Sequence, residues 1–375
     1  DRQALAALDA PGDDSAAGFL APRDTWELGV AQIWEELLDR RPVGVRDDFF
    51  AVGGHSLLAV RLMSALQDRF GVALPLTDLF RDTTVERLAA SLRARRTAAP
   101  ETWSPLVPVQ PRGDAPPLTL VHPTGGTVLC YTPLARALGT DQPLYGLQAA
   151  GIEPDRAPIM SIPEMAALYA ETLVAQQPDG PFHLGGWSFG GVAAAALADA
   201  LIARGRDVAS LILLDSYDPT LFEGRTHAHD DAEIIAALLG GLVEIDPDAL
   251  RTLPPKQRLV RAIGEAEAAG CVPPGFGVEQ AERLLAVATA NYTAVEAYRP
   301  RKLPVRITLL RAADETTAAE THSPGDPTLG WGRWAGAGVT VQMAPGDHQT
   351  MVQAPHATAL ANAIRETLSE AAPPA

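Results

Sequence analysis

The chain has 375 residues, of which 47% are hydrophobic, enough for two or three domains with buried cores. Its formal net charge of −16 argues against binding to nucleic acid or to an anionic membrane surface, both of which need a basic face. Two cysteines, Cys130 and Cys271, are too few for a disulfide framework and lack metal-ligand spacing, so no metal is expected, and no apolar run is long enough to cross a membrane.

Residues 1–19 contain no basic region followed by an apolar core, so no secretion signal is predicted and the expected location is cytoplasmic. Residues 20–95 carry apolar side chains at helical spacing, which predicts a small all-α bundle. Asp24 and Glu27 resemble a capping box for its first helix. A second helix is expected to begin at Ser56.

Ser56 follows two glycines and a histidine and precedes an apolar run, in the sequence GGHSLL. Taken alone, this pattern indicates a serine that caps a helix by bonding its free backbone N–H groups. The same position suits an attached phosphate, because free N–H groups and the helix dipole favour an anion. The two glycines permit a sharp turn that leaves the hydroxyl accessible.

Residues 96–117 are rich in proline and alanine without periodicity, which indicates an extended linker; 96–106 are assigned to it and 107–370 to a second domain. From Pro116 onwards, short apolar runs alternate with helical stretches, as in a parallel sheet covered on both faces. Residues 217–299 interrupt this rhythm with a mostly helical pattern, and so long an insertion is usually a lid or binding element. The predicted strands are 118–121, 144–147, 182–185, 211–214, 305–310 and 339–343.

Residues 186–190 (GWSFG) fit the pattern G-x-S-x-G, which is informative only between a strand and a helix. Here the β-like run PFHLG precedes it and the strong helix former GVAAAALADALIARG follows it. The glycines permit a tight, strained turn that exposes the Ser188 hydroxyl above the sheet. A helix packed closely on a strand would explain the glycines, but not the whole arrangement.

A serine nucleophile needs a base, and the base needs an orienting acid. His348, in a turn after the last predicted strand, is the best placed of the eight histidines. Asp215 and Asp314 both follow the carboxyl end of a strand, where functional groups of open α/β sheets gather, and the residues alone leave this choice open. Two backbone N–H groups are expected to hold the oxyanion: that of Phe189, after the nucleophile, and that of Thr124, in the turn HPTGG.

The segment DDFFAVGGHSLLAVRLMSALQDRFG, with APRDTWE before it and LPLTDLFRDTTVERLA after it, resembles the carrier domains of nonribosomal peptide synthetases. The resemblance implies that Ser56 carries 4′-phosphopantetheine, attached by a phosphopantetheinyl transferase. A polyketide carrier fits less well, because its signature usually reads Asp-Ser-Leu. The opening DRQAL resembles the tail that follows an adenylation domain, so adenylation and condensation domains are the expected upstream partners and 1–19 such a tail.

Residues 107–370 resemble the type I thioesterases of these synthetases, within the α/β-hydrolase fold, on VHPTGG, GGWSFGG, LILLDSYDP, YRP and GDHQTM. The resemblance implies Ser188 as nucleophile, His348 as base and Asp215 as the acid. The chain would then release a finished peptide: Ser188 accepts it from the carrier thioester, and water or a group of the peptide itself frees a linear acid or a ring. A general serine esterase with an accessory helical domain and a catalytically inactive carrier or docking module stay open as alternatives.

Overall fold

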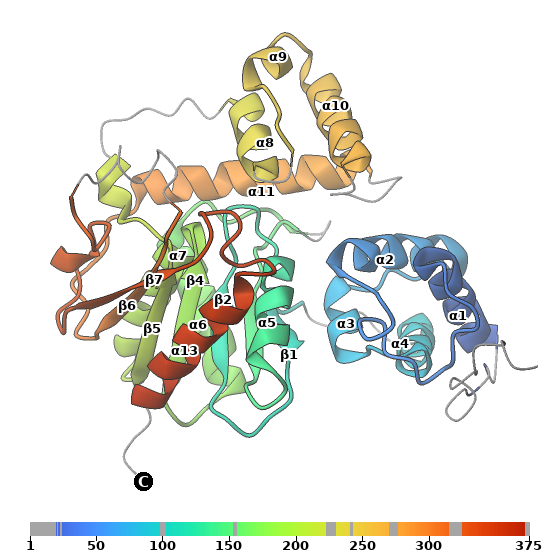
Figure 1. The fold of residues 1–375 in the computed structure, drawn as a ribbon, viewed down its shortest axis with the longest axis horizontal. Helices are drawn as coiled ribbons and strands as arrows, with labels where there is room; N and C mark the ends of the chain where they lie inside the picture. Colours follow the sequence, from blue (N-terminus) through green and yellow to red (C-terminus); the bar gives the residue numbers. More distant parts are fainter. Residues whose placement is uncertain are drawn as a thin grey trace, which may run out of the picture. The chain divides into compact units, whose positions relative to one another are not determined.

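The computed structural model divides the chain into two compact units, Asp1–Glu101 and Thr102–Ala375 (Figure 1). Within the described residues, no helix is both long and apolar enough to cross a membrane, and no cluster of histidine, cysteine or acidic residues could hold a metal ion. The proposed tail, Asp24 of the predicted capping box and Cys271 lie outside the described residues. Those residues are 20, 22, 25–97, 103–152, 156–222, 230–240, 243–269, 277–314 and 325–371.

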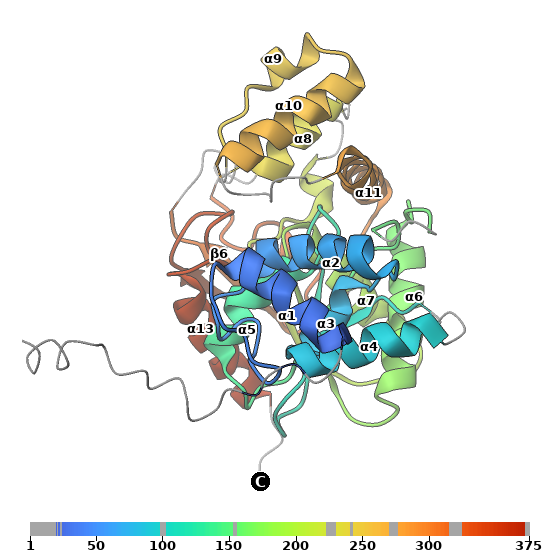
Figure 2. The ribbon, with the colours of Figure 1, turned by 90° about the vertical axis from the view of Figure 1, so that its right-hand side faces the viewer.

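The described part of the first unit is a helical bundle, as the sequence predicted (Figure 2). Trp34 and Phe49 are fully buried at its centre, and their rings meet edge to face with centroids 5.0 Å apart. Because Phe49 belongs to the loop before the second helix, this contact anchors the loop to the core of the bundle. The helices are α1 (Thr25–Leu38), α2 (Ser56–Phe70), α3 (Leu76–Arg81) and α4 (Val85–Thr97).

The second unit is built on a seven-stranded sheet of described residues, in the order β1-β3-β2-β4-β5-β6-β7. Neighbouring strands are parallel except β1 and β3. Helices α5 (Thr132–Leu138) and α13 (Ala357–Glu370) pack together on one face, and α6 (Ile162–Gln176) and α7 (Phe189–Ile202) on the other (Figures 1 and 2). The strands are β1 (Leu106–Gln110), β2 (Leu118–Val121), β3 (Leu144–Leu147), β4 (Phe182–Trp187), β5 (Val208–Leu214), β6 (Ile307–Ala312) and β7 (Val339–Ala344).

The indication of an extended linker over all of residues 96–117 is wrong, because an edge strand lies within it, whereas the assigned linker, 96–106, overlaps a described element only at its two ends. Helix α4 continues to Thr97, and Leu106–Gln110 form the edge strand β1, antiparallel to β3. Val107 and Val109 alternate inwards and are buried, but the proline between them hid this pattern. Proline is tolerated here because an edge strand has one side without a hydrogen-bonding neighbour.

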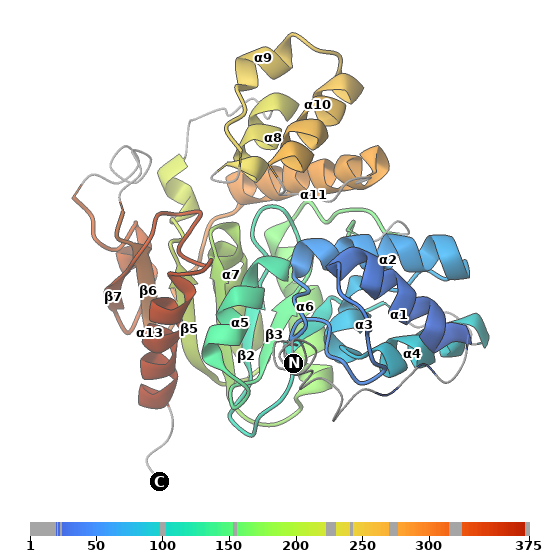
Figure 3. The same ribbon diagram turned by 45° about the vertical axis from the view of Figure 1, so that its right-hand side comes forward.

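Between β5 and β6 the chain leaves the sheet and forms the predicted helical insertion. After a short turn at Pro219–Phe222, it contains α8 (Asp231–Leu239), α9 (Pro247–Arg251), α10 (Pro255–Ala268) and α11 (Val278–Ala297). Helix α11 runs along one end of the sheet, and α8, α9 and α10 lie on its outer side (Figure 3). Residues 223–229, 241–242 and 270–276 of the insertion lie outside the described residues, and a lid role stays a prediction.

Candidate active site

Ser188 lies at the turn from β4 into α7, with a φ of 57° and a ψ of −125°. A residue with a side chain rarely adopts a positive φ, so the turn is strained. A Cβ on Gly186 would stand 2.2 Å from the carbonyl carbon of Gly190, and a Cβ on Gly190 would stand 2.3 Å from the carbonyl oxygen of Val121. Both glycines are therefore needed for the turn to pack against itself and against β2.

His348 links Ser188 to Asp215. Its Nε2 lies 3.1 Å from the Ser188 Oγ, and its Nδ1 lies 2.7 Å from the Asp215 Oδ2. An ionised carboxylate only accepts hydrogen bonds, so Nδ1 carries the proton and Nε2 is left to accept from the serine hydroxyl. The arrangement gives the Ser188 hydroxyl a base within reach and gives that base an orienting acid.

The carboxylate of Asp215 is itself held in place. The residue is 5% exposed, and its second oxygen accepts from the Ala312 backbone N–H at 3.1 Å. Asp314, the other candidate from the sequence, is exposed after β6, and its backbone N–H donates to the carbonyl of Gly346 at 3.0 Å. The carboxylate that contacts His348 is that of Asp215.

Two aromatic residues that sequence reasoning did not single out support the serine turn, and one of them, Trp187, also ties it to the histidine loop. The Trp187 indole donates to the carbonyl of His348 at 2.9 Å, and the two rings lie 5.5 Å apart. The buried Tyr131 hydroxyl donates to the carbonyl of Val121 at 2.6 Å and accepts from the Trp187 backbone N–H at 3.0 Å. Nothing in their sequence spacing signals these contacts, which join residues up to 161 positions apart.

Asp347 shapes the loop that carries His348. Its Oδ1 accepts from the backbone N–H groups of Gln349 and Thr350, at 2.9 and 2.8 Å, and from the Thr350 hydroxyl at 2.8 Å. Burial opposes the ionisation of Asp347, but these hydrogen bonds outweigh it and lower the pKa of its carboxyl. The Asp-x-x-Thr spacing is a readable signal for such a side-chain-closed turn.

The two predicted oxyanion donors belong to neighbouring segments. Phe189 is the first residue of α7, where backbone N–H groups have no partner within the helix. Thr124 follows β2, which pairs with β4 so that Val121 lies opposite Gly186. The turn with Thr124 therefore lies beside the serine turn, and its role as a donor stays a prediction.

An apolar cavity of about 220 Å³ lies beside this turn. Gly125 and Thr127 line one side, and α8, α10 and α11 supply the rest, including Leu238, Ile263 and Leu284. Since Gly125 directly follows Thr124, the cavity adjoins the proposed oxyanion site.

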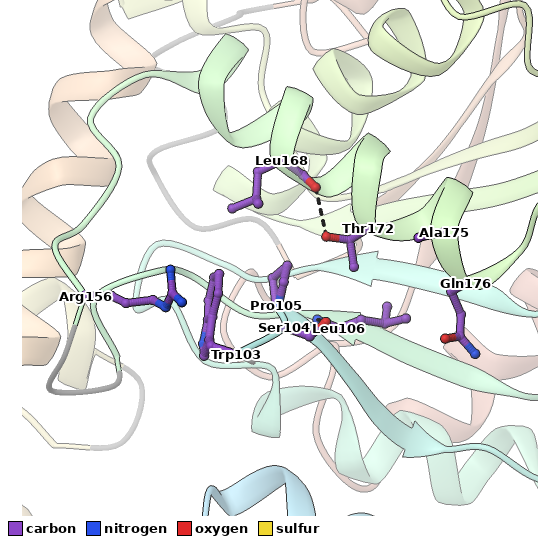
Figure 4. A pocket seen from close by; sticks show the side chains of 9 residues that line it. All are labelled: Trp103, Ser104, Pro105, Leu106, Arg156, Leu168, Thr172, Ala175 and Gln176. Carbon is purple, nitrogen blue, oxygen red and sulfur yellow. Dashed lines mark hydrogen bonds between the residues drawn. The ribbon is translucent and has the colours of Figure 1, made fainter. Parts of the chain in front are cut away.

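A second hollow lies between the start of β1 and α6 (Figure 4). The guanidinium of Arg156 lies 4.4 Å from the centroid of the Trp103 ring, and the Thr172 hydroxyl donates to the carbonyl of Leu168 at 2.9 Å. None of its lining residues comes from the turns that carry Ser188, His348 or Thr124, so this hollow is not part of the candidate active site.

Ser56 is the first residue of α2 and not its N-cap, which is His55. The interpretation of Ser56 as a cap is wrong, because a capping residue must lie outside the helix to reach back to its first N–H groups. The Ser56 side chain is partly exposed. A Cβ on Gly54 would stand 2.4 Å from the Phe49 ring, so the loop packs on the core and leaves the serine accessible. A partly exposed hydroxyl at a helix N-terminus fits attachment of a phosphodiester.

The sheet order, the strained serine turn and the His348 contacts define the second unit as a serine hydrolase with an α/β-hydrolase fold. Residues 116–368 match the family described as a thioesterase domain, and residues 29–92 match the one described as a phosphopantetheine attachment site. The chain therefore belongs to the thioesterase family and carries a phosphopantetheine carrier domain ahead of it. This arrangement matches the C-terminal regions of nonribosomal peptide synthetases.

Curated relatives of the chain are large synthetases. It is 41% identical over 248 residues to a dimodular nonribosomal peptide synthase from Bacillus subtilis (strain 168), a match that covers 66% of this chain and 10% of the relative. It is 32% identical over 392 residues to chondramide synthase cmdD from Chondromyces crocatus, covering 99% of this chain and 10% of the relative. The chain thus spans about a tenth of the length of these two relatives.

Solved structures of a synthetase and of a thioesterase domain are similar to this chain. A holo four-domain nonribosomal peptide synthetase bound to AMP and glycine matches 98% of this chain and 27% of its own length, with 32% identity and a TM-score of 0.66. The Vlm2 thioesterase domain bound with a dodecadepsipeptide matches 70% of this chain and 96% of its own, with 27% identity and a TM-score of 0.54.

Proposed function

We propose that this chain releases a finished peptide from a nonribosomal peptide synthetase. The observation that carries the proposal is the line of contacts from Ser188 through His348 to Asp215, in a chain that also has a carrier domain. We assign residues 20–95 to the carrier and start the releasing domain at or before Leu106. Adenylation and condensation domains are the proposed upstream partners, since the curated relatives are whole synthetases.

Phosphopantetheine on Ser56 supplies a thiol that holds the peptide as a thioester. His348 Nε2 takes the hydroxyl proton as the Ser188 Oγ attacks the thioester carbonyl. The N–H groups of Phe189 and Thr124 bind the oxyanion, and Asp215 stabilises the imidazolium. When the carbon–sulfur bond breaks, His348 returns the proton to the departing thiol and the peptide is an ester of Ser188.

The second half of the reaction decides the product. His348 accepts a proton from water, or from an amine or hydroxyl of the peptide itself, as that group attacks the ester carbonyl. Water gives a linear acid, whereas an internal nucleophile gives a ring that is lighter by one water. The mass of the released product separates the two modes.

The apolar cavity supports a substrate class. At about 220 Å³ it is larger than the roughly 150 Å³ engineered cavity that binds benzene, so it has room for an aromatic or branched aliphatic side chain. We propose that it receives an apolar side chain near the thioester. Peptidyl thioesters with Phe or Leu there should be released faster than the same peptides with Asp, and Leu238→Asp should reduce that preference. Equal rates for all three peptides would contradict this assignment.

Loading and release can be followed in one experiment. A phosphopantetheinyl transferase with a peptidyl coenzyme A should load wild type but not Ser56→Ala, as read by intact mass. Loaded wild type should then lose the peptide with time, whereas loaded Ser188→Ala should keep it. Failure of Ser56 to load, with an active Ser188, would favour a general esterase. Normal loading with no labelling of Ser188 by a serine-reactive phosphonate would favour an inactive carrier or docking module.

A further inference from the structure

His122 contacts both segments that carry the proposed oxyanion donors. It follows β2 directly and is fully buried. Its Nδ1 lies 2.8 Å from the carbonyl oxygen of Pro123, and its ring stacks on that of Phe189, with centroids 5.5 Å apart and planes at 20°.

The partners of His122 fix its tautomer. A carbonyl oxygen only accepts, so Nδ1 carries the hydrogen, and Nε2 then accepts from the Tyr169 hydroxyl at 2.9 Å. Burial lowers the pKa of His122 to about 4, against a weaker opposing effect of the Pro123 carbonyl, so the ring is neutral near pH 7. Bonds at both nitrogens hold the ring in one orientation.

The Pro123 carbonyl and the Thr124 N–H belong to one planar peptide group and point in opposite directions. A hydrogen bond that holds this carbonyl therefore also sets the direction of the Thr124 N–H. The Gly126 N–H donates to the same oxygen at 2.9 Å, so the carbonyl is held from two sides.

The next peptide group is held from the helical insertion. The Asn291 side chain, on α11, donates from Nδ2 to the carbonyl oxygen of Thr124 at 2.8 Å. Asn291 is 1% exposed, and buried apolar residues flank it on the same helix, among them Ala288 and Ala294. A buried amide without a partner is costly, so this bond fixes where α11 lies against the turn.

We infer that His122 and Asn291 are positioning residues that aim the Thr124 N–H at the oxyanion, His122 from the sheet and Asn291 from the insertion. The inference rests on the proposed function. It also gives the insertion a part in the chemistry, because a shift of α11 moves the carbonyl that Asn291 holds.

The test measures turnover of a peptidyl N-acetylcysteamine thioester by the full chain. Two variants are compared with wild type: His122→Phe keeps a ring but has no Nδ1–H, and Asn291→Leu keeps the side-chain volume but has no amide. We expect kcat to fall about 10- to 100-fold in each, less than the roughly 10²–10³ for a lost oxyanion donor, with KM unchanged. Affinity for a peptidyl boronate, which forms a tetrahedral adduct on Ser188, should fall in parallel. His122→Asn, which keeps a donor near the Nδ1 position, should recover part of the loss.

Matched controls exist on β4, the strand beside β2, and on α11. His183 is also buried, burial also lowers its pKa, and it bonds the Ser210 hydroxyl at 2.9 Å, but it lies at the amino end of β4, opposite Leu118. Thr293 lies on α11, and the hydrogen bond that the structure gives its hydroxyl goes to the Thr289 carbonyl of the same helix. His183→Asn and Thr293→Val should lower the melting temperature while kcat stays within about twofold of wild type.

Wild-type kcat in both His122→Phe and Asn291→Leu would overturn the inference, and so would a rise in KM with unchanged boronate affinity. In either case wild type still turns over and Ser188→Ala does not, so the proposed function stands. If wild type and Ser188→Ala are equally inactive, the proposed function fails and the inference with it. Should His122→Phe not fold, His122→Asn and Asn291→Leu decide the outcome.

Discussion

Ser56 and Ser188 both stand at the start of a helix, but their surroundings differ. Ser188 has a positive φ and stands between glycines that have no room for a Cβ. Ser56 is the first residue of a regular helix, after an extended residue with a φ of −137°. Of the two glycines before it, Gly54 packs on Phe49, but Gly53 has open space where a Cβ would stand. The difference teaches that a nucleophile must be held against its base, whereas an attachment point need only be accessible to the enzyme that modifies it.

The largest expected effect separates the two serines directly. Ser188→Ala should reduce peptide release by about 10⁴-fold or more, because the reaction loses its nucleophile, while loading of Ser56 is unchanged. Single-turnover release from the loaded carrier measures this. Release at the wild-type rate would require another nucleophile. Cys130 is a poor one, since burial raises the pKa of its thiol.

The second prediction concerns Asp215, because the reaction at Ser188 needs an acid that orients His348, whereas loading of Ser56 does not. Asp215→Asn keeps the shape but favours the wrong tautomer of His348, and we expect kcat/KM to fall by about 10³–10⁴. Asp314→Asn, the matched control, should stay within about tenfold of wild type, because Asp314 is exposed. Equal losses in the two variants would break the assignment of Asp215.

These residues show how far the sequence alone could go. Ser188 and His348 were predictable because each has a local signature, a glycine-flanked turn between strand and helix and a turn after the last strand. The choice between Asp215 and Asp314 needed the family resemblance, since both follow strands and only the three-dimensional arrangement puts one beside His348. Strand β1 was missed because Pro108 masks its alternation. The contacts of Trp187 join loops far apart in the chain, and no local pattern reports them.

The third prediction compares the glycines beside the two serines. Gly190→Ala drives a Cβ into the carbonyl of Val121, so turnover of a soluble thioester should fall about 100-fold while Ser56 still loads. Gly53→Ala meets no described atom but strains a φ of 113°, at a cost of about 1–3 kcal/mol, so it should slow loading and spare turnover. The reverse pattern, with turnover lost in Gly53→Ala, would show that the two loops do not act separately.

The smallest effect is on stability. Ser56→Ala should change the free energy of unfolding by less than about 0.5 kcal/mol, because Ser56 lies inside α2 and His55 holds the N-cap position. Urea melts of the apo forms measure this difference. A loss of about 1 kcal/mol or more would mean that the Ser56 hydroxyl does cap the helix.

The position of the insertion between β5 and β6 bears on how such enzymes diversify. These strands are parallel neighbours in the sheet, with Leu211 beside Ile307 and Leu214 beside Leu310, so the chain leaves at the carboxyl end of β5 and crosses back to the amino end of β6. The entropic cost of closing a loop rises only slowly with loop length. Segments of very different size can therefore replace this one by recombination without disturbing the register of β5 and β6. Chimeras built at these two junctions should therefore fold, and those whose new segment places an amide where Asn291 meets Thr124 should have the higher kcat.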